Sequence, residues 1–120
     1  MTHFFDGAMG TQLQGLGLPV QECPEIWNIT HPEEIIQIHK NYLNAGAEFL
    51  QTHTFGAHPL KLANYGLADE TEKIIAAAVH NAQTAAAGKA QIAGALGPIG
   101  QLVEPLGKLS FDEAFLGYQR

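Results

Sequence analysis

The sequence predicts an α/β protein with a parallel sheet. Three short apolar segments, at 3–6, 48–54 and 90–95, alternate with longer stretches that have helical periodicity. Three strand–loop–helix units in succession are typical of α/β proteins. Because right-handed crossovers bring the carboxyl ends of parallel strands to one edge of the sheet, we expect a ligand site at that edge.

The first unit pairs a brief strand at 3–6 with a long loop at 7–29, which is rich in glycine and proline. A helix then begins near Thr30, since Thr30 and Glu33 have the spacing of a capping box. Apolar side chains recur along one face of this helix, and Gly46 ends it.

The second unit begins with a strand at 48–54. A short helix over 60–65 follows. Asp69 and Glu72 then cap a helix that runs to about Ala87. Small residues line one face of this helix, and they favour close packing on a sheet.

The third unit has a strand at 90–95 and a Gly/Pro-rich loop at 97–109. Ser110 and Glu113 cap a last helix, which is still running at Arg120. Natural domains rarely stop within an amphipathic helix, so we expect the sequence to be part of a larger domain.

Composition narrows the class of protein. The chain has 120 residues, of which 46% are hydrophobic, and a net charge of −6 with only six Lys and Arg. These values indicate one globular domain or less, and argue against nucleic acid or an anionic membrane as a partner. No apolar run reaches the roughly 20 residues of a membrane span, and no signal peptide is evident, so we expect a cytoplasmic protein. The single cysteine, Cys23, excludes an internal disulfide and a cysteine-based zinc site made by this chain alone.

Asp6 closes the first predicted strand and is followed by Gly7, Ala8 and Gly10. An acidic side chain at a strand end can hold a cation, and glycine N–H groups can approach an anion because no Cβ blocks them. This segment is a candidate binding site for a small polar ligand. The simpler interpretation is that Asp6 only tightens the turn.

Polar side chains also end the second predicted strand. Thr52 and Thr54 alternate with His53, so they point to the opposite face from it. If that face is the interior of the site, their hydroxyls can reach a substrate; otherwise they are ordinary strand residues. Phe55 is a candidate pocket wall, although an aromatic there is more often part of the core.

Two alternative sites are weaker. His53 and His58, together with Asp6, could bind a metal such as zinc, but their spacing matches no known ligand pattern, and two surface or loop histidines are the simpler interpretation. The segment 94–100 is glycine-rich, yet it lacks the pattern of a dinucleotide-binding loop.

Several segments resemble a known family. In order along the chain they are Asp6–Gln14, Glu22–Asn28, Thr52–Ala57, Gly97–Gly100, Glu104–Gly107 and Leu109–Phe111. Together they resemble the homocysteine S-methyltransferase domain, in the version found at the amino end of cobalamin-dependent methionine synthases. The resemblance runs over essentially the whole chain.

The resemblance implies a (β/α)8 barrel, of which residues 1–120 would form the first three βα units, the N-terminal part of a homocysteine-binding domain. It implies methyl transfer to the thiol of homocysteine, giving methionine. Asp6 would then take the substrate ammonium, and the N–H groups of Gly7 and Ala8 its carboxylate. Thr52, Thr54 and Phe55 would line the same pocket.

The cofactors implied are zinc, bound by cysteines on later strands that this chain lacks, and methylcobalamin as the methyl donor. The remaining barrel strands and the cobalamin and folate domains would be partners. Relatives use betaine or S-methylmethionine, and the sequence does not choose among the donors. We therefore expect the chain alone to be inactive.

The sequence departs from the commonest family pattern at His53 and His58, where asparagine is frequent. Two other functions remain open. One is a non-catalytic partial barrel that binds or assembles with another chain through its open sheet edges. The other is a barrel enzyme for a phosphorylated substrate, against which the low basic content counts.

Overall fold

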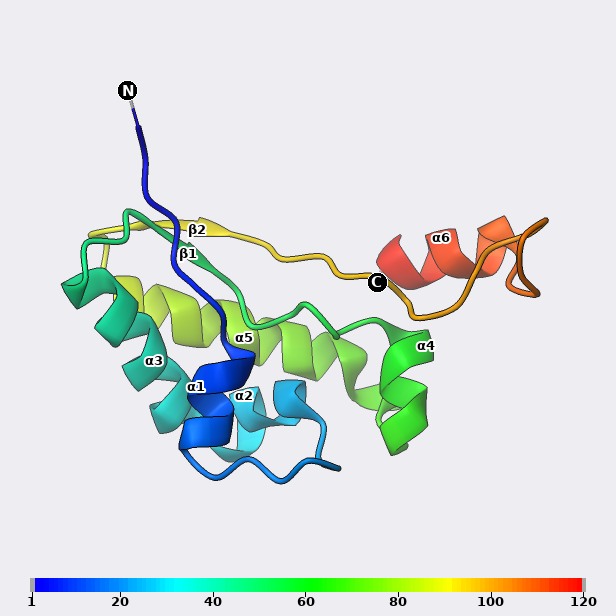
Figure 1. Cartoon of the computed structure of the whole chain (residues 1–120), viewed down its shortest axis with the longest axis horizontal. Helices are drawn as coiled ribbons and strands as arrows, with labels where there is room; N and C mark the ends of the chain where they lie inside the picture. The colour runs from blue at the N-terminus through cyan, green and yellow to red at the C-terminus, as the bar shows by residue number, and fades with distance from the viewer. Residues whose placement is uncertain (1, 120) are drawn as a thin grey trace.

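Two short parallel strands lie over a layer of helices in the computed structural model, which describes residues 2–119 (Figure 1). Strand β1 (Phe49–Gln51) pairs with β2 (Gln91–Ala93), and Leu50 lies opposite Ile92. The predicted α/β class with a parallel sheet is confirmed.

The first predicted strand is reduced to a single parallel bridge between Phe5 and Phe49. The N–H of Glu48 donates to the Phe4 carbonyl at 2.8 Å, and the N–H of Asp6 donates to the Phe49 carbonyl at 3.1 Å. The rings of Phe5 and Phe49 stack with their centroids 4.7 Å apart. The prediction of a strand here was wrong in extent, because the segment pairs with β1 alone and over very few residues.

The other two strands are also shorter than predicted, because side-chain hydroxyls replace the backbone ladder beyond Gln51. The N–H of Thr52 still donates to the Ala93 carbonyl at 2.9 Å. After that, the N–H of Ala95 donates to Thr52 Oγ1 at 3.2 Å, and Thr54 Oγ1 donates to the Ala95 carbonyl at 2.7 Å.

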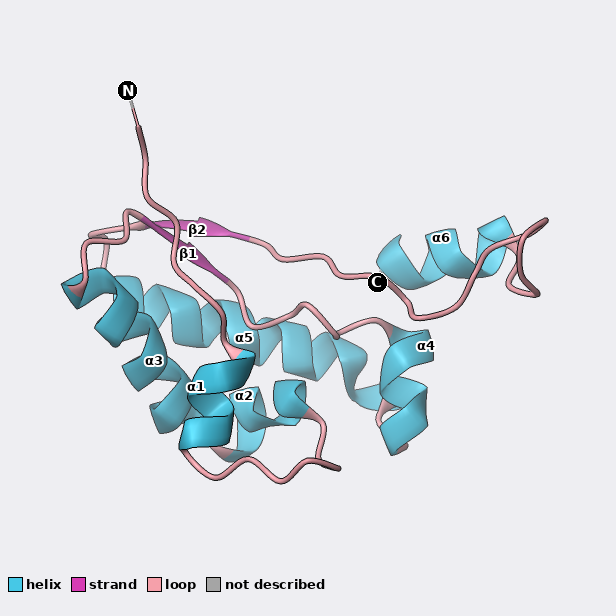
Figure 2. Ribbon diagram, in the orientation of Figure 1, coloured by secondary structure: helices cyan, strands magenta, loops and turns pink. Residues whose placement is uncertain are grey.

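Helices α3 (Pro32–Asn44) and α5 (Thr71–Ala86) pack on each other and cover one face of the strands (Figure 2). Leu50 of β1 is fully buried against Ala85 and Ala86 of α5. The small side chains of α5 allow this close approach, as the sequence predicted. Removing Leu50 from water stabilises the contact by about 2 kcal/mol.

The predicted loop at 7–29 contains helical turns, so this prediction was wrong. Helix α1 covers Gly10–Gly15, a 3₁₀ turn η1 covers Pro24–Ile26, and α2 covers Trp27–Thr30. Leu13 and Trp27 are buried in one cluster with apolar residues of α3. Burial of these two side chains outweighs the local preference of the glycines and prolines for loops.

Two of the three helices predicted from capping boxes begin later than predicted. Helix α3 begins only at Pro32, and the Thr30 hydroxyl donates instead to the Ile26 carbonyl at 3.2 Å. Helix α5 begins at Thr71, beyond the predicted Asp69, and its N-cap Glu70 makes no side-chain capping bond. In both places a short helical turn precedes the helix and includes the first predicted capping residue, Thr30 in α2 (Trp27–Thr30) and Asp69 in the 3₁₀ turn η3 (Ala68–Glu70).

The third capping box is confirmed. Glu113 donates its N–H to Ser110 Oγ at 3.2 Å, and the Glu113 carboxylate accepts from the Ser110 N–H at 3.3 Å. Helix α6 (Phe111–Gln119) follows. The short helix after β1 is also confirmed, as α4 (Pro59–Leu62) and the 3₁₀ turn η2 (Ala63–Tyr65).

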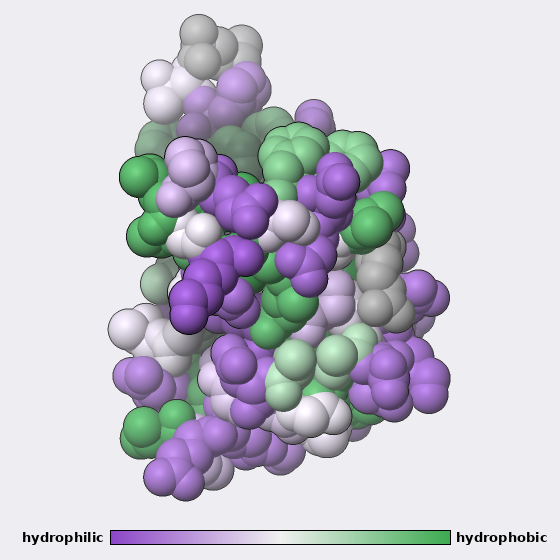
Figure 3. Space-filling model, turned by 90° about the vertical axis from the view of Figure 1, so that its right-hand side faces the viewer, coloured by the Kyte–Doolittle hydropathy of each residue, from purple (hydrophilic) through white to green (hydrophobic). Residues whose placement is uncertain are grey.

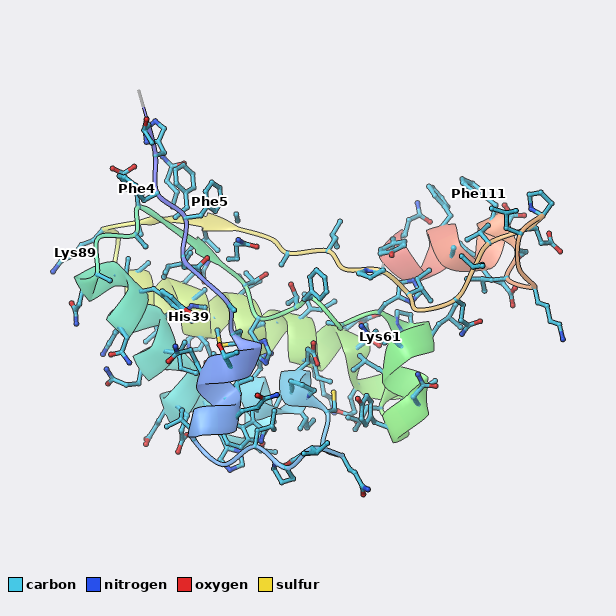
Figure 4. All side chains as sticks on the ribbon, viewed as in Figure 1. Phe4, Phe5, His39, Lys61, Lys89 and Phe111 are labelled. Atoms are coloured by element: carbon cyan, nitrogen blue, oxygen red, sulfur yellow. The ribbon has the colours of Figure 1, made fainter. Side chains whose placement is uncertain are left out.

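Helix α6 lies apart from the helical layer, at the far end of a long connection from β2 (Figure 1). Phe111, Phe115 and Leu116 of α6 are exposed, and Figure 3 shows this end of the molecule with apolar side chains among hydrophilic ones. Phe4 and Phe5 are exposed on the side of the strands away from α3 and α5 (Figure 4). No helix within residues 2–119 has the length and apolar character needed to cross a membrane.

Candidate binding pocket

A pocket of about 640 Å³ lies where the chain leaves β1 and β2. Its walls come from five segments: the loop after Phe5, turn η1, the end of β1 with the residues after it, helix α4 with the turn behind it, and Ala95 after β2. The lining includes Asp6, Gly7, Ala8, Glu25, Gln51, Thr52, His53, Phe55, Gly56, Lys61 and Tyr65. A cavity thus lies at the carboxyl edge of the strands, where the sequence analysis expected a site.

Asp6 contributes a half-buried carboxylate to this pocket. Its Oδ2 accepts a 3.0 Å hydrogen bond from the Gln51 N–H. Its Oδ1 is shielded from water and has no hydrogen-bond partner among residues 2–119. Burial raises the pKa of Asp6, and the bond from Gln51 lowers it in part. A cation in the pocket would relieve this cost of burial.

Gly7 and Ala8 line the pocket, and Tyr42 of α3 contacts both. The Tyr42 hydroxyl donates to the Ala8 carbonyl at 2.6 Å. A Cβ on Gly7 would lie 2.8 Å from the Tyr42 ring, so the glycine makes room for the aromatic side chain. The sequence showed Tyr42 only as part of an apolar helix face, and gave no sign of this contact.

Strand β1 ends at Gln51, so the predicted alternation does not extend to Thr52 and Thr54, and both Thr52 and His53 line the large pocket. The hydroxyls of Thr52 and Thr54 bond to each other at 2.7 Å, and both also bond to Ala95 after β2. Thr52 lines the large pocket, whereas Thr54 lines a smaller neighbouring one. The structure therefore gives both hydroxyls a role in joining the ends of the strands.

Phe55 is 58% exposed and forms part of the pocket wall. Lys61 extends from α4 (Figure 4). Its ammonium lies 5.8 Å from the centre of the Phe55 ring. At this distance the cation and the ring attract each other. Lys61 is the only Lys or Arg among the described residues that line the pocket.

Buried polar groups fasten turn η1 to the segment after β1. Asn28 Nδ2 donates to the carbonyls of Glu25 and His53, at 2.9 and 2.8 Å. His53 Nε2 lies 2.8 Å from the Pro24 carbonyl. The Gly56 N–H donates to Glu25 Oε1 at 2.8 Å. These bonds fix two walls of the pocket to each other.

His53 and His58 lie in loops, as the simpler interpretation held, but both are buried and are not surface residues. Burial lowers the pKa of His53, although the Pro24 carbonyl and the charge of Glu25 act in the opposite direction. His58 Nδ1 accepts from the Leu60 N–H at 3.1 Å, so this nitrogen caps α4. The two histidines thus serve different contacts.

The residues present do not fit a zinc site. Within the described part of the chain, no three His, Cys, Asp or Glu side chains are grouped so that they could hold a metal ion. Cys23 is buried, and its thiol donates to Glu25 Oε2 at 3.5 Å. Burial and the charge of Glu25 raise the pKa of Cys23 to about 11, which disfavours the thiolate that zinc binds.

Comparison with known proteins agrees with this geometry. The profile of the family "Homocysteine S-methyltransferase" matches residues 3–120. A methionine synthase of Mycobacterium tuberculosis is 44% identical over 70 residues, covering 53% of this chain and 6% of that protein. A methionine synthase of Mycobacterium leprae is 36% identical over 105 residues, covering 78% of this chain and 9% of that protein.

A solved structure is also similar. The homocysteine methyltransferase MmuM from Escherichia coli, in its oxidized form, superposes with a TM-score of 0.68 and 28% identity, covering 82% of this chain and 38% of that one. The metallated form of MmuM gives the same values. The chain therefore spans less than a tenth of the two methionine synthases and under two fifths of MmuM. Because the family profile matches almost every residue, the chain belongs to the homocysteine S-methyltransferase family.

Proposed function

We propose that the pocket binds the amino-acid end of homocysteine, as part of an enzyme that transfers a methyl group to the homocysteine thiol. The observation that carries the proposal is that Asp6 lines a large pocket while its buried Oδ1 has no hydrogen-bond partner among the described residues. An ammonium group supplies the charge and the N–H donors that this oxygen lacks.

The loop behind Asp6 supports the other half of the proposal. No acceptor among the described residues takes a hydrogen bond from the N–H groups of Gly7 and Ala8. These donors suit the substrate carboxylate, while Thr52 and Phe55 bound the rest of the cavity. The chain then orients homocysteine, and orientation alone can supply a large part of a catalytic effect.

We further propose that the three strand–helix units are the first three of a (β/α)8 barrel. The exposed Phe4, Phe5 and Phe111 support this, because later units of a barrel would cover such side chains. Zinc, methylcobalamin and the remaining domains of a methionine synthase belong to this proposal as partners of the complete enzyme. A cytoplasmic location stays a prediction of the sequence.

The exposed apolar side chains also support a second candidate function, that of a partial barrel that assembles with another chain. Multi-angle light scattering separates the two. A monodisperse dimer or larger closed assembly of the 120-residue chain supports the assembly module, while a monomer or an unordered aggregate supports the barrel segment.

The binding proposal is tested by titrating L-homocysteine into the ¹⁵N-labelled chain and following amide shifts by NMR, which detects millimolar affinity. We expect saturable shifts at Gly7, Ala8 and Gln51, and a loss of affinity of about tenfold in Asp6→Asn. Equal affinities would contradict the role of Asp6. Without the rest of a barrel, the chain should form no methionine from homocysteine and methylcobalamin above the rate without protein.

A further inference from the structure

Asn28 of α2 is a buried polar residue that the proposed function leaves without a role. It ends the segment Glu22–Asn28, one of those that resemble the homocysteine S-methyltransferase family. The residue is only 1% exposed and is not among those that line the pocket. Because burial of a side-chain amide costs free energy unless hydrogen bonds replace those to water, the partners of Asn28 indicate what it does.

The amide nitrogen of Asn28 joins two walls of the pocket. Nδ2 can donate two hydrogen bonds, and it faces the Glu25 carbonyl at 2.9 Å and the His53 carbonyl at 2.8 Å. Glu25 belongs to turn η1, whereas His53 follows β1, and both line the pocket. Since carbonyls only accept, they require the nitrogen on this side, and Oδ1 is left buried without a described partner. The side chain is therefore oriented by these two carbonyls.

The backbone of Asn28 is fastened to the helical layer. In a continuous helix its carbonyl would accept from the N–H four residues on, but that residue is Pro32, which has no N–H. Asn81 of α5 supplies the missing donor, because its Nδ2 lies 3.0 Å from the Asn28 carbonyl. Asn81 is itself buried, and α5 packs on α2. The two pocket walls are thus connected through Asn28 to α5.

The wall that contains His53 receives little support from the sheet. Strand β1 ends at Gln51, and the described backbone–backbone bonds after Thr52 are local, from the Thr54 N–H to the Thr52 carbonyl and from the Ala57 N–H to the Thr54 carbonyl. The His53 carbonyl lies between them and accepts from Asn28. A displacement here would also affect Gln51, two residues earlier, whose N–H bonds to Asp6.

We infer that Asn28 is a positioning residue for homocysteine binding, which holds turn η1 and the segment after β1 at the separation that the bound amino acid requires. This inference rests on the proposed function and adds to it a residue outside the pocket. Walls that are fixed before the ligand arrives need less ordering on binding, so they increase affinity without a contact to the ligand. Without the two donors of Nδ2, the carbonyls of Glu25 and His53 would be unpaired and the walls free to move apart.

The test measures the affinity of the 120-residue chain for L-homocysteine by NMR titration, and its stability by urea unfolding. The variant is Asn28→Asp, which keeps the size of the side chain and removes both donors. Asn41→Asp is the matched control, because Asn41 is exposed on α3 and accepts from Gln37 at 2.9 Å. Ile99→Val is a control for stability alone, since Ile99 is buried in a separate cluster with Leu109 and Ala114.

We expect Asn28→Asp to weaken homocysteine binding by the folded chain about tenfold. Asn41→Asp and Ile99→Val should each keep the affinity within about twofold, although Ile99→Val lowers the urea midpoint. A lower urea midpoint with unchanged affinity in Asn28→Asp would overturn the inference, while homocysteine binding by the parent chain still supports the proposed function. No homocysteine binding by the parent chain would overturn both.

Asn81→Asp decides the matter if Asn28→Asp does not fold. It removes the donor to the Asn28 carbonyl and leaves the bonds to Glu25 and His53, so we expect a smaller loss of affinity, of about threefold. Unchanged affinity in folded Asn81→Asp would then overturn the inference. Failure of both variants to fold would overturn it as well, because the two asparagines would then serve the fold.

Discussion

The Tyr42 hydroxyl donates a 2.6 Å hydrogen bond to the Ala8 carbonyl and so joins helix α3 to the loop behind Asp6. This single bond links the packed helical layer to the mouth of the pocket. The loop itself carries no side chain that could fix it, because Gly7 and Ala8 offer only backbone groups. The position of the proposed anion donors thus depends on a residue more than thirty positions away.

Tyr42→Phe should therefore weaken homocysteine binding several-fold and lower the free energy of unfolding by about 1 kcal/mol, the usual net contribution of one hydrogen bond. Urea unfolding and NMR titration measure the two effects. Tyr65→Phe is the control, since Tyr65 borders the same pocket and no hydrogen bond from its hydroxyl to the described chain is broken. Equal effects of the two variants would contradict the role of the Tyr42–Ala8 bond.

Gly7→Ala should be destabilising by about 1–3 kcal/mol, because its Cβ would lie 2.8 Å from the Tyr42 ring and the ring or loop must move. Gly10→Ala is the matched control three residues on. A Cβ there meets nothing within 4 Å, and Gly10 begins helix α1. Alanine should be neutral or slightly stabilising at that position. Equal urea midpoints for both variants would exclude the steric role of Gly7.

Cys23 should react slowly with iodoacetamide. Its pKa is raised to about 11 by burial and by the charge of Glu25. At pH 8 the thiolate fraction is then about one in a thousand, so we expect alkylation at least about a hundredfold slower than for a free thiol. Mass spectrometry at timed intervals measures the rate, and 6 M urea provides the unfolded control. Fast labelling of the folded chain would show that the thiol is accessible.

Local sequence patterns were sufficient to predict the structure where a residue interacts with its neighbours along the chain. The capping pair Ser110 and Glu113 forms as spaced, and helix α3 ends at Asn44, just before Gly46 with φ of +106°. Glycine adopts this left-handed conformation without the strain that a Cβ would bring. Such features are set within one turn of chain, so the sequence alone predicts them.

Sequence patterns did not predict the structure where segments distant in sequence pack together. Thr30 has the spacing of a cap, but burial of Trp27 places a helical turn there first. Asp6 was a candidate from its position behind a strand, whereas Glu25 carried no local sign of its bond to Gly56. A pattern in the sequence gives the side chains available to a pocket, and tertiary packing decides which of them face it.

His39 of α3 makes the stability of the chain depend on pH. The side chain is fully buried, and neither ring nitrogen has a hydrogen-bond partner within the described residues. Burial, and to a smaller extent the charge of the nearby His53, lowers the pKa of His39 to about 4. The folded state therefore holds the neutral ring, whereas the unfolded chain takes up a proton near the ordinary value of 6.5.

Since the unfolded state binds more protons between these two pKa values, the stability associated with neutral His39 is fully present above pH 6.5 and is lost as the pH falls toward 4. The loss should approach about 3 kcal/mol. Urea midpoints at pH 7.5, 6 and 5 measure it. His39→Leu should remove most of this dependence and remove an unsatisfied buried polar group at neutral pH. The remaining slope is expected from His53, whose pKa is lowered in the same direction. An unchanged slope in His39→Leu would assign the pH dependence to other groups.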